Sequence, residues 1–594
     1  MIRVFPVKSG LALVILLSLA TGPAFAQTEG DALPLVPDGA PAALEAPPPA
    51  LPYDPVEAPV TGNEGTSDIE IGELEKPDPD SGGILDASMG GFGPDLWAGT
   101  DRALLLRLLA QLPTEQNSPA LHDLTRRLLL STAIAPPRGE VDNGASLIAT
   151  RIERLAAIGL TGAVAEMMAS APAPETDGVL MQLHIDNRLL LNDNEAACKG
   201  AAVSAEMLDP LFRDRIAIFC SILAGDKDAA SFSTNLLREG GDLDDPTFFT
   251  LADSLTAGTR PNVKSLTDPA PIHLAMAAAA KAKLPSDVLE TRSPLMLRAL
   301  ANSPLVSDSV QLAAAERAVL AGALDASNLA ERYAALKFSK KELDSAISIA
   351  EGEHSPRNRA LLYQAMKLRK LPVARAGAIQ KAWSLAAADG IFRLGVAVYR
   401  AELEALQPGA ELAWFAPEAA RALFLLDQPE QALAWATTAQ HFAKEPEEKR
   451  AAALLWPLTA LAEGSATGPG HERWLAAAME ENAAEAGMHA GFAYSLFEAM
   501  GERVPDNRWA ALLQGSVRAG VLAPDPAYMR AFRKAAQAGR RGETILLAVL
   551  VLGNGDLTED GPTLLSEIVV GLRKVGLENE GRRLAIEAAL AAGL

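Results

Sequence analysis

Beyond Thr100, the chain consists of helix-length apolar runs separated by short polar turns, and this pattern constrains the fold more than any other feature. In the first run, Leu105, Leu108 and Leu112 fall on one helical face, whereas Arg107 lies off it. Runs of about 12–18 residues, broken by Gly, Pro, Asp or Asn, continue to the last residue. Alternating strand patterns joined by Asn-Gly turns are missing. The sequence therefore predicts an all-α fold.

A recurring spacing predicts that consecutive helices pair as hairpins. A bulky apolar residue closes one helix and a small residue follows six positions later, as in Leu223 and Ala229, Leu368 and Ala374, Leu426 and Ala432, and Val575 and Gly581. A second helix lies tightly against the first only where its facing side chain is small. In the first hairpin, Gly225 is expected to end one helix in the left-handed conformation, and Asp226 is expected to cap the next.

The length of the helical part favours an array of stacked hairpins, an α-solenoid. Residues 94–594 greatly exceed the size at which one compact core stops growing, about 250–300 residues. In an array each hairpin packs mainly on its neighbours, so this limit does not apply. The alternative is two or three helical domains, divided in the Pro-rich region 259–271.

Residues 419–440, with the sequence AARALFLLDQPEQALAWATTAQ, resemble one tetratricopeptide repeat (TPR). Small or apolar residues stand at the packing positions of that family, namely Ala420, Leu423, Ala432, Ala436 and Ala439. The resemblance implies a TPR-like superhelix of stacked hairpins. It also implies a concave groove that takes a protein or peptide partner.

Residues 1–26 have the features of a secretory signal peptide. Two basic residues precede a short apolar core at 11–20, and small residues follow at Ala24 and Ala26, which predicts cleavage between Ala26 and Gln27. The core is short for a membrane span. No later run resembles a span, so we expect no stable membrane insertion after cleavage. The expected location is the bacterial periplasm, with secretion as the alternative.

Residues 27–93 have the composition of a linker. They are rich in Pro, Asp, Glu and Gly, and their apolar residues are too sparse to repay the entropy of ordering. We therefore expect a disordered, Pro-rich and acidic linker, which either holds the folded part at a distance or is a passive tail. The whole chain has 75 acidic and 53 basic side chains and a net charge of −22. Such a charge argues against nucleic acid as a partner.

The two cysteines are predicted to form a disulfide. Cys198 and Cys220 lie eleven residues either side of Asp209, which begins a natural turn with Pro210, so a tight helical hairpin places them opposite each other. In an oxidising compartment such a pair should bridge. The alternative is two unpaired, buried small side chains. A redox-active role is not indicated, because the pair is not arranged as Cys-x-x-Cys.

No motif for catalysis, a cofactor or a metal site is assembled in the sequence, so we do not predict an enzyme. Glu351 and His354 have a spacing used in di-iron helical bundles, but the second copy of the motif is missing. The acidic stretch 77–83 lacks the glutamate of a calcium loop, and 554–561 has Glu559 where such a loop needs glycine and lacks the glutamate as well, so both are interpreted as turns. His-Glu-x-x-His, Gly-x-Ser-x-Gly and P-loop motifs do not occur.

The sequence favours a non-catalytic scaffold or adaptor that binds another envelope protein or a peptide through its helical array. The aromatic residues proposed for partner binding are Trp414, Phe415, Trp435 and Trp474, although aromatic residues more often serve packing. The competing hypothesis is an accessory or catalytic factor of peptidoglycan metabolism. For that role Glu480 and Glu481 lie near an apolar patch, but neighbouring residues on a helix point apart.

Overall fold

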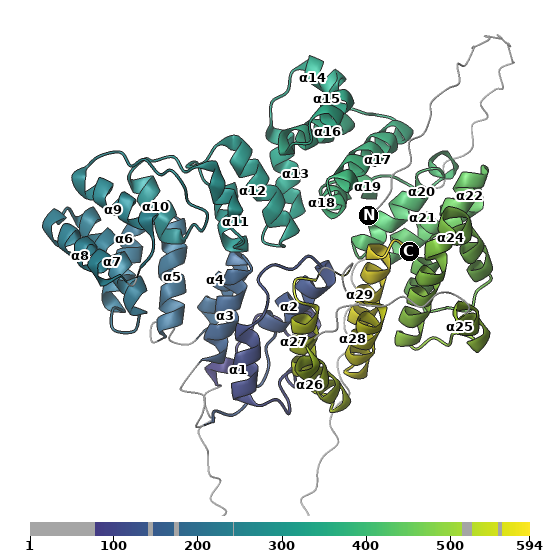
Figure 1. The fold of residues 1–594 in the computed structure, drawn as a ribbon, viewed down its shortest axis with the longest axis horizontal. Helices are drawn as coiled ribbons and strands as arrows, with labels where there is room; N and C mark the ends of the chain where they lie inside the picture. Colours follow the sequence, from purple (N-terminus) through teal and green to yellow (C-terminus); the bar gives the residue numbers. More distant parts are fainter. Residues whose placement is uncertain are drawn as a thin grey trace, which may run out of the picture. The chain divides into compact units, whose positions relative to one another are not determined.

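The computed structural model describes residues 78–139, 146–171, 177–241, 243–513, 525–555, 557 and 561–594. Within these ranges all regular secondary structure is helical, apart from one isolated bridge between Leu85 and Ser131 (Figure 1). The all-α prediction is therefore confirmed. The predicted signal peptide and its cleavage site lie outside the described residues. Within them, no helix combines the length and apolar character that crossing a bilayer requires.

The first elements are η1 (Pro79–Ser81), η2 (Ala87–Met89), α1 (Arg102–Ala110), α2 (Pro119–Leu130), α3 (Leu147–Ala157), α4 (Thr161–Ser170), α5 (Gly178–Leu190), α6 (Asn194–Val203), α7 (Pro210–Ala224), α8 (Lys227–Gly240), α9 (Pro246–Ala257) and α10 (Pro271–Ala279). They are followed by η4 (Ser286–Glu290), α11 (Pro294–Ala301), α12 (Asp308–Leu320), α13 (Ala326–Ala335), α14 (Lys340–Asp344), α15 (Ala346–Gly352), α16 (Pro356–Lys367), α17 (Pro372–Ala388), α18 (Phe392–Val398) and α19 (Arg400–Glu404). The last elements are η5 (Ala410–Leu412), α20 (Ala416–Leu425), α21 (Pro429–Phe442), α22 (Pro446–Ala453), α23 (Trp456–Glu463), α24 (Gly470–Ala499), α25 (Asp506–Leu512), α26 (Pro526–Gln537), α27 (Arg541–Leu552), α28 (Pro562–Lys574) and α29 (Glu578–Ala591).

Local capping explains where many of these helices begin and end. The Asp101 carboxylate accepts a hydrogen bond from the Leu104 N–H at 2.8 Å and starts α1. Gly225 has a φ of 81° and ends α7, while the Asp226 carboxylate accepts from the Ala229 N–H at 3.1 Å and starts α8. Both predicted roles in this turn are confirmed.

The four predicted hairpins exist, but the rule for their facing residues holds only in part. The pairs α7–α8, α16–α17, α20–α21 and α28–α29 all pack together. Ala432 is fully buried, and a methyl group on Gly581 would lie 3.5 Å from the Val569 carbonyl oxygen, as close approach requires. In the other two hairpins Ala229 and Ala374 are exposed, so the prediction that they face the preceding helix is wrong.

The packed part of the chain begins earlier than residue 94. Asp80 is fully buried and Phe92 is 4% exposed, and the Ile84 N–H donates to the Leu130 carbonyl at 2.9 Å. The segment 78–93 therefore belongs to the helical unit, contrary to the linker boundary expected from composition. Its glycines look like linker residues, but Gly83 lets the backbone lie against the end of α2, where a side chain at this position would come within 2.5 Å of the Ser131 backbone. The rest of the expected linker lies outside the described residues.

Residues 259–271 do not divide the described helices into separate units. The helices before and after this region belong to one compact unit, and α9 packs directly on α10. The alternative of two or three separate helical domains is not supported by this arrangement.

Helices far apart in the sequence also pack together, which a purely sequential array would not predict. α2 packs on α27 and α29 as well as on α3. The Gly542 N–H donates to the Leu96 carbonyl at 2.9 Å, and a side chain at this glycine would collide with that oxygen. Arg127 on α2 forms an ion pair with Glu580 on α29 at 2.7 Å. The first and last helices of the unit are therefore joined by direct contacts.

Candidate functional site

The described residues contain no group of three or more His, Cys, Asp or Glu side chains placed to bind a metal ion. Glu351 and His354, which have di-iron spacing, engage different partners: Glu351 forms an ion pair with Lys381, and the His354 ring bonds to Asp389. The two side chains do not converge. Glu480 and Glu481 are both exposed on α24.

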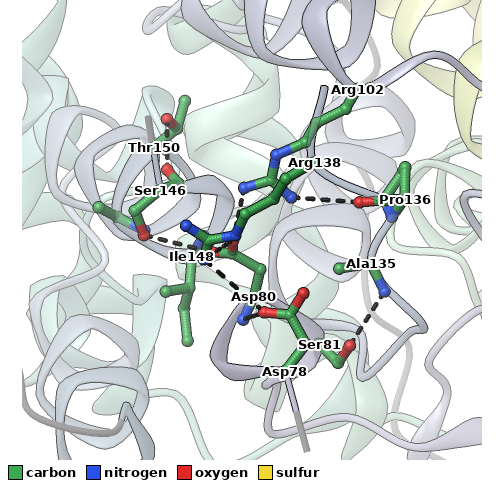
Figure 2. Close-up of polar contacts among 11 residues, drawn as sticks. Asp78, Asp80, Ser81, Arg102, Ala135, Pro136, Arg138, Ser146, Ile148 and Thr150 are labelled. Carbon is green, nitrogen blue, oxygen red and sulfur yellow. Dashed lines mark hydrogen bonds and ion pairs between the residues drawn. The ribbon is translucent and has the colours of Figure 1, made fainter. Parts of the chain in front are cut away.

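Asp80 lies at the centre of a buried polar cluster (Figure 2). Its carboxylate accepts from the Ile148 N–H at 2.9 Å, and it forms ion pairs with Arg102 at 2.5 Å and Arg138 at 2.9 Å. Burial alone would raise the pKa of Asp80. The hydrogen bonds from Ile148 and Arg102 and the charges of both arginines outweigh burial and lower the pKa. Asp80 is therefore a buried carboxylate held in its ionised form.

This cluster fixes the start of the folded unit. Arg151, fully buried beside it, donates to the carbonyls of Leu129, Gly82 and Ser131. The contacts thus join the segment before α1 to α2 and α3. Because arginines and N–H groups occupy the Asp80 carboxylate, the described part of the acidic stretch, residues 78–83, serves packing.

A second cluster contains an Asp–His pair of the kind found in general-base catalysis. The His273 Nε2 lies 2.8 Å from an Asp245 oxygen, and Arg215 donates to the same oxygen at 2.9 Å. The other ring nitrogen of His273 accepts from the Ala270 N–H at 3.0 Å. Both ring nitrogens are thus engaged within the protein, so His273 has no lone pair to offer a substrate. The arrangement ties α7 and α9 to α10.

A third cluster links α12, α13, α16 and α17 through buried charges. The Tyr333 hydroxyl donates to Glu316 at 2.5 Å, and Arg359 pairs with both Glu316 and Asp389. Arg359 and Tyr333 line a small cavity together with Tyr399, whose hydroxyl is buried without a hydrogen-bond partner in the described part of the chain. The cavity has room for about one water molecule, so it is too small for an organic substrate.

The predicted disulfide is present. Cys198 on α6 and Cys220 on α7 are bonded, with their Cα atoms 5.6 Å apart. Asp209, at the turn before Pro210, caps α7 by accepting from the Phe212 N–H at 3.0 Å. The bond connects two consecutive antiparallel helices and stabilises one hairpin.

Three of the four aromatic residues proposed for partner binding are in the core. Phe415, Trp435 and Trp474 are at most 2% exposed. The rings of Phe415 and Trp435 meet edge to face with centroids 5.9 Å apart. These three side chains therefore cannot contact a partner in this conformation. Trp414 is half-buried and keeps part of its surface in solvent.

The surface of α8 shows a feature that the sequence interpretation missed. Phe232 is 70% exposed and Leu236 is 60% exposed, and their spacing of four residues places them on the same helical face. The buried side of α8 is formed by the small residues Ala230 and Thr234. In a surface helix the bulky apolar residues normally face the core. The apolar pair among Ser, Thr and Asn residues was the available sequence signal.

A second exposed apolar feature is the loop between α16 and α17. Leu368 is 64% exposed, Leu371 70% and Val373 42%. The spacing of Leu368 and Ala374 correctly indicated a hairpin here, but it did not indicate that these side chains remain in solvent.

Comparisons with known proteins add no assignment. No family model matches the chain, and no curated protein or solved structure matches it either.

Proposed function

We propose that this protein is a non-catalytic scaffold or adaptor of the bacterial periplasm, which binds an envelope protein or peptide through a TPR-like α-solenoid surface. The observation that carries this proposal is the exposed apolar pair on α8, a helix that packs Leu237 partly against the core. Its bulky residues Phe232 and Leu236 face solvent, and its main packing neighbours, α7 and α9, contact other sides. Together these two side chains offer an apolar ridge to an apolar groove or helix of a partner.

The remaining polar clusters support the same proposal. The side chains of Asp80, His273 and Glu316 form their hydrogen bonds and ion pairs with residues of neighbouring helices. The His273 cluster joins α7 and α9, the two helices that pack on α8, to α10, and a support fixed before binding lowers the entropic cost of binding. The Cys198–Cys220 bond lies in the adjacent hairpin and fits an oxidising compartment.

Capture of envelope proteins by crosslinking tests the proposed binding surface. The double variant F232S/L236S should lose a captured protein that the unmodified chain retains, because two exposed apolar anchors are removed without loss of core contacts. The variant N235S, on the same helix, is the matched control and should capture normally. If both variants capture equally, α8 is not the binding surface.

Sedimentation with purified peptidoglycan distinguishes the proposed scaffold from the competing hypothesis, a factor of peptidoglycan metabolism. Retention on the polymer, with no protein captured, would favour an accessory factor of cell-wall metabolism. Turnover that disappears when one carboxylate is changed would establish an enzyme.

The proposed location is tested by sequencing the N-terminus of the protein in the periplasmic fraction. Cleavage by a signal peptidase should leave Gln27 as the first residue. An intact Met1 in that fraction would contradict the proposed signal peptide.

A further inference from the structure

We propose that the α16–α17 loop is a membrane-surface anchor that contacts bilayers containing anionic lipid. The loop and the first turn of α17 present Leu368, Leu371 and Val373 to solvent within six residues. Between them stand the exposed cations Arg369 and Lys370. Apolar side chains that enter the headgroup region, together with cations that meet anionic headgroups, are the two elements of interfacial binding.

The two cations of the loop have no competing ion-pair partner in the part of the chain that the structure describes. Among the described residues neither Arg369 nor Lys370 forms an ion pair, whereas Lys367 and Arg375, on either side, are both paired with Glu402. The protein thus neutralises the flanking cations and leaves the central two available. Their position after α16 suits the negative end of the helix dipole. The dipole does not explain the exposed leucines on either side of them.

A third exposed cation lies beside the loop. Gln364, one turn before Leu368, donates to the carbonyls of Tyr333 and Leu336, each at 2.7 Å. This contact brings the end of α13 alongside the last turn of α16. Lys337, the residue after Leu336, is exposed and has no ion pair in the described part of the chain. The positive charge of the loop is therefore reinforced by a neighbouring helix end.

A bilayer suits this loop better than a peptide ligand does. The exposed leucines stand on the short connection of a helical hairpin, and the loop lines neither of the small cavities near Tyr399 and His354. A hairpin connection of this kind can enter the headgroup layer, whereas a peptide needs a groove. The net charge of −22 repels an anionic surface at long range, but at physiological ionic strength this repulsion is screened beyond about 8 Å.

Co-sedimentation with lipid vesicles tests the proposal. The chain from Gln27 onward is used, because it keeps the complete helical unit and lacks the apolar run 11–20. It should bind vesicles of phosphatidylglycerol and phosphatidylcholine, and it should not bind vesicles of phosphatidylcholine alone. Binding should weaken as salt is added.

Two loop variants separate the contributions that the leucines and the cations make to vesicle binding. L368S/L371S should bind the anionic vesicles at least about tenfold more weakly, since it removes two leucines that enter the bilayer surface. R369Q/K370Q should bind about tenfold more weakly through loss of charge. F232S/L236S is the matched control: it removes two exposed apolar residues from α8 and should bind vesicles normally. All six substituted residues are exposed, and circular dichroism verifies that each variant folds.

Three results would overturn the proposal. The first is that the unmodified chain does not bind anionic vesicles. The second is that the α8 control loses binding as much as the loop variants do. The third is that a crosslinker placed at Leu371 captures an acidic protein while vesicles are not bound, which would assign the loop to that protein. Loss of vesicle binding in the loop variants leaves partner capture through α8 unaffected, so this test and that of the proposed function fail separately.

Discussion

The hairpins α7–α8 and α20–α21 share one sequence pattern but differ in what they bury. In α20–α21 the small residue Ala432 faces the first helix, and Trp435, one turn later, is buried. In α7–α8 the corresponding Ala229 is exposed, and so is Phe232. α20 also packs on α18 and α29, and α21 packs on α22 and α23, whereas α8 packs mainly on α7 and α9. The turn determines that a hairpin forms, and the neighbouring helices determine which of its faces is buried.

The largest expected difference between the two hairpins comes from truncating their aromatic residues. Trp435→Ala removes a ring that packs on Phe415 and should lower the free energy of unfolding by about 3–5 kcal/mol. Phe232→Ala should change it by no more than about 0.5 kcal/mol, because this ring is mostly in solvent. Chemical denaturation of both variants measures the difference. Equal losses would show that Phe232 is packed in solution.

The disulfide should stabilise only the region of α6 and α7, the helices that it connects. Replacing Cys198 and Cys220 with serine reopens a loop of 22 residues, and the chain-entropy model gives a loss of about 3 kcal/mol. Hydrogen exchange should then increase in α6 and α7 and stay unchanged in α20 and α21. A uniform increase across both hairpins would contradict this separation and show that the whole unit unfolds together.

Enlarging the small facing residue gives a smaller and more local effect. Ala432→Leu forces a larger side chain into the contact between α20 and α21 and should cost about 1–3 kcal/mol. Ala229→Leu, at the equivalent position of α7–α8, should cost no more than about 0.5 kcal/mol because Ala229 is exposed. Thermal unfolding distinguishes the two variants. A large loss with Ala229→Leu would restore the facing-residue rule for this hairpin.

Local chemistry in the sequence was sufficient to predict the helices, the turn at Gly225 and the Cys198–Cys220 bond. Each depends on residues close in the sequence, where capping and helical spacing act. The burial of Asp80 was not predictable in this way, because its partners Arg102, Arg138 and Ile148 come from segments up to 68 residues away. Composition alone made the segment 78–93 look like linker.

The exposed surfaces were not predictable for the same reason. Periodicity places Phe232 and Leu236 on one face of α8, but it does not reveal that no neighbouring helix covers that face. The same limit applies to Phe415 and Trp474, where the sequence identified aromatic residues and only the packing showed them to be buried. Which apolar face remains free is decided by contacts between distant helices.

His471 extends the comparison to pH, because it lies in the well-packed helices near α21. Its ring is 6% exposed, and its Nε2 lies 2.6 Å from the Tyr494 hydroxyl. Burial, assisted by the charge of Arg508 and opposed by Glu472, lowers the pKa of His471 to about 4. The folded state therefore binds fewer protons than the unfolded state between pH 6.5 and 4. The contribution of His471 to the free energy of unfolding is therefore fully present above pH 6.5, and it declines as the pH falls through this window.

The smallest expected effect is the pH-dependent part of the contribution of His471 to the free energy of unfolding. Between pH 7 and pH 5.5, the native chain should lose about 1 kcal/mol more unfolding free energy than the His471→Gln variant, which has no imidazole to protonate. His441→Gln, at the exposed end of α21, is the matched control and should follow the native chain. Denaturation at the two pH values measures the difference. Parallel pH profiles for the native chain and His471→Gln would mean that the ring is accessible to solvent, so that packing in this region is looser than in α20–α21.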